Sequence, residues 1–209
     1  MNDQGAQIND QAGQAGQAGH AEGAQAGGRE RIVADVRHWL ARAVIGLNLC
    51  PFAKSVYVKD QVRYVVSDAS RDEQLLEELE RELRALADSD PAQVDTTLLI
   101  VPHMLLDFLA YNDFLYFADR LLGSMRLAGT LQIASFHPQY QFDGTSPDDI
   151  ENYTNRAPYP ILHLLREDSI ARAAEAFPDA EDIYARNMET LRQLGHAGWL
   201  KWMSEKSDL

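Results

Sequence analysis

Side chains able to do chemistry gather in one polar segment, which runs from His137 to Arg166. Its two histidines, His137 and His163, titrate near neutral pH and can transfer protons. His137 follows a predicted strand, and ligand sites form beyond the ends of parallel strands. His163 instead interrupts an apolar run, so we expect it to be partly buried. We predict both as catalytic residues, with a hydrogen-bonded structural histidine as the alternative at each position.

A candidate anion-binding group lies between the two histidines. Arg156 follows Asn152 and Asn155, and an arginine fork beside two amides can hold a carboxylate or a phosphate in a fixed plane. The alternative is that Arg156 pairs with Asp148 or Asp149 and only pins the loop. The residues predicted to bind substrate are Asn152, Asn155, Arg156, Tyr140 and Cys50.

Cys50 is the single cysteine of the chain, so no disulfide can form within it. It lies at the end of the first predicted helix, where the helix dipole disfavours a thiolate. We therefore expect a buried thiol that lines the site, not an activated nucleophile. His137, His163 and a carboxylate would be enough for a three-ligand metal site, but no two of them have helical spacing. The sequence assigns no metal and leaves any cofactor unknown.

The connection that carries most of this polar segment is about twenty residues long, whereas connections in compact domains are usually about four to six residues long. Its tyrosines and prolines favour an ordered loop, and long ordered loops commonly carry function. One hypothesis is an enzyme acting on a small anionic metabolite, which requires Cys50, His137, Asn152, Arg156 and His163 to face one cleft. The other is a non-catalytic binding or interaction protein whose loop 137–166 is a structural clasp. A clasp bonds its polar groups to one another and to backbone, and leaves no open pocket.

The elements that must position these residues follow from the spacing of apolar side chains. Helices are predicted over residues 32–47, 75–86, 104–125, 169–177 and 183–194, and strands over residues 62–66, 96–101, 131–136 and 161–165. Gly195 is the expected end of the last helix, and Trp199 and Trp202 are expected to dock on the body of the protein.

The order of these elements, α-β-α-β-α-β-β-α-α, predicts an α/β protein, three-layered or an α+β variant. Its centre is a mixed sheet of about four strands with helices packed on it. The first three strands are expected to be mainly parallel, and the fourth is not. A thioredoxin-like topology has this count of elements, and several α+β folds share it.

Composition divides the chain into two parts. Residues 1–28 are rich in Gln, Ala and Gly and predict a disordered tail, while residues 29–209 predict a single globular domain. The net charge of −13 argues against nucleic-acid binding and against anionic membrane surfaces. No run is long and apolar enough to span a bilayer, so a soluble, cytoplasmic protein is expected. The sequence does not indicate an oligomeric state.

Three longer stretches carry a family resemblance: GLNLCPFAK (Gly46–Lys54), SFHPQYQF (Ser135–Phe142) and PDDIENYTNRAPYPILHLLRE (Pro147–Glu167). They resemble the bacterial family known as domain of unknown function 1415. The resemblance covers the chain from about Arg31 to Trp199. It implies a bacterial intracellular protein, and it brings no established reaction, cofactor or catalytic residue.

Overall fold

The computed structural model describes residues 26–175 and 182–205. Its first helix covers residues 26–39 and continues as the π-helix η1, Leu40–Ile45. The predicted stop near Asn48 is confirmed, because Asn48 has a positive φ of 54° and Pro51 follows soon after. Residues 26–28, assigned to the tail by composition, are helical, and residues 1–25 of that tail lie outside the described residues.

The centre of the fold is a four-stranded mixed sheet in the order β1-β2-β4-β3. Its strands are β1 (Val62–Val66), β2 (Thr96–Ile100), β3 (Leu131–Phe136) and β4 (Ile161–Arg166). β1 and β2 are parallel, and β4 is antiparallel to both β2 and β3. The first three strands therefore run in one direction, as predicted. However, β4 lies between β2 and β3, so β3 is an edge strand whose neighbour is antiparallel, which the sequence analysis did not foresee.

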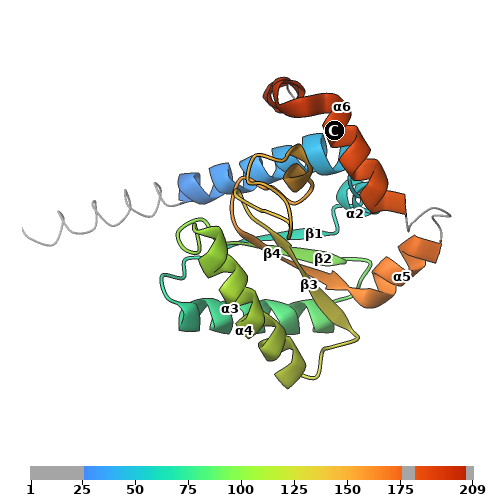
Figure 1. Ribbon diagram of the computed structural model, residues 1–209. Helices are drawn as coiled ribbons and strands as arrows, with labels where there is room; N and C mark the ends of the chain where they lie inside the picture. The colour runs from blue at the N-terminus through green and yellow to red at the C-terminus, as the bar shows by residue number, and fades with distance from the viewer. Residues whose placement is uncertain (1–25, 176–181, 206–209) are drawn as a thin grey trace, which may run out of the picture.

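Two helices cover one face of the sheet, α3 (Asp72–Asp88) and α4 (Phe108–Ser124). Figure 1 shows them together below the strands. The apolar stripe of α3 is fully buried against the sheet, because its leucines recur at helical spacing on one side. α4 runs through Tyr111 without a break: Tyr111 is wholly buried, and its hydroxyl donates to the carbonyl oxygen of Ile161 (2.8 Å).

The other face of the sheet is covered by the first helix and by four further helical segments (Figure 1). These are α2 (Ala53–Val58), the 3₁₀-helix η2 (Ile150–Thr154), α5 (Glu167–Glu175) and α6 (Ile183–Ser204). No sequence pattern predicted α2 or η2, because helices of five or six residues are too short to show a period. Gly195 adopts a left-handed φ of 62° and interrupts α6 where its end was predicted, and the chain then resumes a helix.

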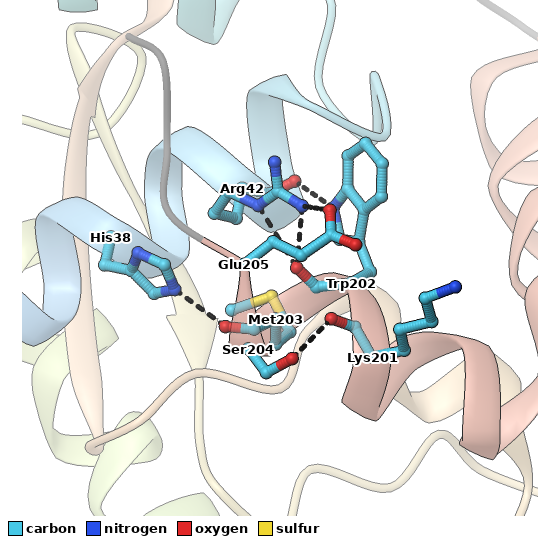
Figure 2. Close-up of polar contacts among 7 residues, drawn as sticks. All are labelled: His38, Arg42, Lys201, Trp202, Met203, Ser204 and Glu205. Atoms are coloured by element: carbon cyan, nitrogen blue, oxygen red, sulfur yellow. Dashed lines mark hydrogen bonds and ion pairs between the residues drawn. The ribbon is translucent and has the colours of Figure 1, made fainter.

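The last turn of α6 docks on the first helix, as expected from its tryptophans (Figure 2). The indole Nε1 of Trp202 donates to the carbonyl oxygen of Arg42 (2.8 Å), and the Arg42 guanidinium donates back to the carbonyl oxygen of Trp202 (2.7 Å). His38 Nε2 donates to the carbonyl oxygen of Met203 (2.9 Å). Side chains of each helix thus bond to carbonyl groups near the end of the other helix. Across the described residues, no helix combines the length and the apolarity that a membrane span requires.

Candidate functional site

A cavity of about 670 Å³ lies between the sheet and the helical layer that contains η1, α2 and α5. Because side chains alternate along a strand, one face of β2, β4 and β3 forms its floor. That floor includes Leu98, His163, Ala134 and Phe136. The walls are mostly apolar side chains, among them Leu40, Val44, Val56, Ile170 and Ala173. The fold therefore builds an apolar cavity with few polar groups inside it.

His163 is the ionisable side chain at the floor of this cavity. Its Nε2 lies 2.7 Å from the hydroxyl oxygen of Thr96, and that hydroxyl donates to the carbonyl oxygen of Leu164 (2.7 Å). No described residue is hydrogen-bonded to its other nitrogen, Nδ1. Burial lowers the pKa of His163 to about 4, so the imidazole is neutral at neutral pH.

Cys50 lies in the wall of the same cavity as a free thiol. Burial raises the pKa of the Cys50 thiol, and backbone hydrogen bonds from Phe52 and Ala53 offset only part of that effect. The protonated thiol is therefore the dominant form at neutral pH, as the sequence analysis expected. A protonated thiol is a weak nucleophile and a weak metal ligand.

Polar residues lie at the margin of the cavity. The hydroxyl of Ser169 donates to a carboxylate oxygen of Asp95 (2.6 Å), and the guanidinium of Arg172 donates to the same hydroxyl (2.9 Å). Lys59 and Arg172 are exposed, whereas Arg166 donates to the carbonyl oxygens of Leu86 and Ser89 at the end of α3. The positive charges around the cavity are thus solvated or already bonded.

His137 occupies a different environment, because its side chain is wholly buried beside α4. Its Nδ1 accepts from the backbone N–H of Gln139 (3.0 Å), and its Nε2 donates to the carbonyl oxygen of Leu105 (3.0 Å). The rings of Phe108 and Tyr111 lie 5.4 and 5.1 Å from the imidazole. Burial lowers the pKa of His137, so it too is neutral. Both ring nitrogens are used inside the protein, and the ring does not reach the cavity.

Asn152 organises the loop that the sequence analysis singled out. It is wholly buried, and its Oδ1 accepts from the backbone N–H of Phe142 (3.0 Å) and from the hydroxyl of Thr145 (2.8 Å). Its Nδ2 donates to the carbonyl oxygen of Ser146 (2.8 Å). Asn155 donates to the carbonyl oxygen of Ser135 (3.1 Å). Both amides hold backbone in place.

Arg156 also bonds to the loop that contains it. Its Nε donates to the carbonyl oxygen of Tyr140 (3.2 Å), and its Nη2 donates to that of Pro147 (2.5 Å). Its guanidinium carbon lies 4.5 Å from the centre of the Tyr153 ring. Arg156 thus pins the loop through carbonyl oxygens, and not through Asp148 or Asp149 as the alternative to anion binding had it. Arg156 lines a smaller hollow of about 390 Å³ that also contains Trp39.

The cavity therefore brings together only two of the seven predicted site residues, Cys50 and His163. The other five, His137, Tyr140, Asn152, Asn155 and Arg156, do not line it. The apolar floor and walls could not be predicted from the sequence, because apolar residues on strands and helices carry no chemical signature. One usable signal was present: His163 shares a strand face with Ile161 and Leu165, so it had to face the same layer as they do.

Within the described residues, no group of three or more His, Cys, Asp or Glu side chains is placed to hold a metal ion.

Comparisons with known proteins point to one family. No curated protein and no solved structure matches the chain. The family described as "Protein of unknown function (DUF1415)" matches residues 31–201, which is most of the chain and includes both the cavity and the loop. This match confirms the resemblance of the three longer stretches, and the chain belongs to the DUF1415 family.

Proposed function

We propose that this protein binds a small molecule with a largely apolar body in the cavity between the sheet and the η1–α2–α5 layer, without catalysing a reaction on it. The observation that carries the proposal is the cavity itself, at about 670 Å³. Small-molecule sites are commonly about 300–1,000 Å³ in volume, with apolar walls and a few polar groups that set orientation. In this cavity His163 and Cys50 supply polar groups among apolar side chains.

Catalysis is disfavoured by the chemistry of those groups. A general base works best when its pKa lies near the operating pH. The pKa of His163 is about 4, and burial raises the pKa of Cys50, so neither group is tuned to move a proton or to attack substrate at neutral pH. His137, predicted as the partner of His163, is sealed beside α4 with both nitrogens bonded.

An anionic substrate is disfavoured for a related reason. Arg156, the expected anion-binding side chain, donates to two carbonyl oxygens and lies outside the cavity. A buried anion would need a charged or well-ordered donor set to offset its loss of hydration. The apolar floor around Leu98 and Ala134 offers no such set.

We assign loop 137–166 the role of a structural clasp. Its polar side chains Asn152, Asn155 and Arg156 bond to backbone atoms of the loop or of β3. Such bonds fix a long connection over the sheet without a ligand, because buried polar groups must find partners. The clasp thus fixes the connection between β3 and β4, the strand that carries His163.

Binding can be tested with a simple aromatic probe. Isothermal titration with 2-naphthol should give a dissociation constant below about 1 mM, as expected for a fragment of this size. Ala134→Phe, on the cavity floor, and Gln132→Trp, at its exposed margin, should each weaken binding at least tenfold. Ala110→Phe, at an exposed position of α4 outside the cavity, is the matched control and should bind as the wild type does. Equal affinity in all four proteins would place the probe elsewhere and refute the proposal.

A further inference from the structure

We infer that the ligand of this cavity presents a hydroxyl or N–H donor to Nδ1 of His163. The inference rests on the proposed function, since it names the chemistry of the ligand for the same cavity. The hydroxyl of Thr96 has a single proton. The carbonyl oxygen of Leu164, 2.7 Å from Thr96 Oγ1, can only accept, so that proton lies between them.

The Thr96 hydroxyl oxygen is then left with only lone pairs to offer His163. Its 2.7 Å contact with Nε2 therefore requires a proton on Nε2. A neutral imidazole has one ring N–H, so Nδ1 of His163 bears a lone pair. The strand hydrogen-bonding pattern thus selects the tautomer, and it leaves an acceptor at the floor of the cavity.

No described residue donates to this acceptor. In the sheet, His163 lies opposite Leu98 on β2 and Ala134 on β3, and the Phe136 ring centre is 5.9 Å away. The side chains of these neighbours carry no polar hydrogen. In these apolar surroundings, a donor group of the ligand would hydrogen-bond to Nδ1. A carboxylate, ether or carbonyl oxygen of the ligand would instead be repelled, because both atoms are acceptors. The ligand class is therefore an apolar molecule with an alcohol, phenol or N–H group.

Two probes with the same ring system test this directly. 2-Naphthol carries an O–H donor, whereas 2-methoxynaphthalene carries a methyl group in place of that proton. Isothermal titration of the wild-type protein should show 2-naphthol binding about tenfold more tightly, the ratio expected for one such hydrogen bond. Equal affinities would overturn the inference and leave the proposed function standing. Failure of both probes to bind would refute the proposed function, and the inference with it.

Two substitutions at His163 locate the preference. His163→Gln keeps an N–H near the place of Nε2 and has no acceptor near the place of Nδ1, so the two probes should bind equally. His163→Asn places an amide oxygen near the site of Nδ1 and should restore part of the preference for 2-naphthol. His103→Gln, at an exposed histidine, is the matched control and should keep the full preference. If folded His163→Gln still binds 2-naphthol more tightly than 2-methoxynaphthalene, another acceptor causes the preference. That result would contradict the inference.

Discussion

The hydroxyl oxygen of Thr96 on β2 lies 2.7 Å from Nε2 of His163 on β4. This contact joins two strands that are 67 residues apart in the chain at these positions. It ties the threonine hydroxyl, already bonded to the carbonyl oxygen of Leu164, to the imidazole of His163 on the cavity floor. The same pair therefore stabilises the sheet and determines which ring nitrogen of His163 faces a ligand.

Removal of the Thr96 hydroxyl should destabilise the folded protein. Thr96→Val leaves the Nε2–H of His163 without an acceptor in a buried place, which should lower the free energy of unfolding by about 1–3 kcal/mol. Urea denaturation at neutral pH measures this loss. The neighbouring Thr97 is a matched control, because its hydroxyl is buried and has no hydrogen-bond partner among the described residues. Thr97→Val should leave stability unchanged or raise it. Equal losses for both variants would show that the Thr96 contact contributes nothing specific.

Stability should also depend on the protonation of His163. Its pKa is about 4 in the folded protein against 6.5 for an unperturbed histidine, so the unfolded chain binds the proton more readily. The contribution of neutral His163 to the free energy of unfolding is therefore fully present above pH 6.5 and is lost as the pH falls toward 4. Between pH 7 and pH 5 it should cost about 2 kcal/mol of unfolding free energy.

His163→Gln isolates this contribution from those of other groups, such as His137, whose pKa is lowered in the same direction. Urea denaturation at pH 7 and at pH 5 gives, for each protein, the change in the free energy of unfolding between the two pH values. The variant should lose about 2 kcal/mol less than the wild type over that interval. An identical pH dependence would mean that His163 does not titrate in the way that its burial requires.

The clasp role of the loop can be tested at Arg156. Arg156→Ala removes two hydrogen bonds to carbonyl oxygens and a contact with the Tyr153 ring, so it should lower the free energy of unfolding by about 1–2 kcal/mol. Its affinity for 2-naphthol should not change. Arg120→Ala, which removes an exposed arginine hydrogen-bonded to the exposed Tyr116, is the control and should be nearly neutral. Unchanged stability in Arg156→Ala, together with loss of binding, would support a ligand site in the loop instead.

Cys50 reports on the cavity because it lies in the wall and is the single cysteine. Iodoacetamide should alkylate it more slowly than a cysteine in urea-unfolded protein, since burial raises the pKa of the thiol. Saturating 2-naphthol should slow the reaction further, by about tenfold if the bound state blocks access. Intact-mass spectrometry follows the single modification. An alkylation rate that does not respond to the probe would place bound 2-naphthol away from Cys50.

Much of the fold could be predicted from the sequence, because periodic apolar residues record which side of an element is buried. Val62–Val66 and Leu131–Phe136 were predicted with the bounds that the structure has. The strand order could not be predicted, since the position of β4 between β2 and β3 depends on tertiary packing and on no local pattern.

The candidate site was harder to predict, for a physical reason. Polar residues such as Asn152 and Arg156 stand out in a sequence, yet in this fold they hold the loop together. The cavity is made by apolar side chains from separate elements, and only their assembly creates it. His163 was identified because a histidine interrupts an apolar strand, but its acceptor nitrogen became evident only through its partner Thr96.

The central claim is that the cavity is the binding site and that His163 Nδ1 orients the ligand. A crystal structure of the protein soaked with 6-bromo-2-naphthol tests it most directly, because anomalous scattering locates the bromine without ambiguity. The predicted result is a bromine peak between the sheet and η1, with the hydroxyl oxygen about 3 Å from Nδ1 of His163. A peak confined to the smaller hollow beside Trp39, or to the surface, with the cavity unoccupied, would contradict the claim.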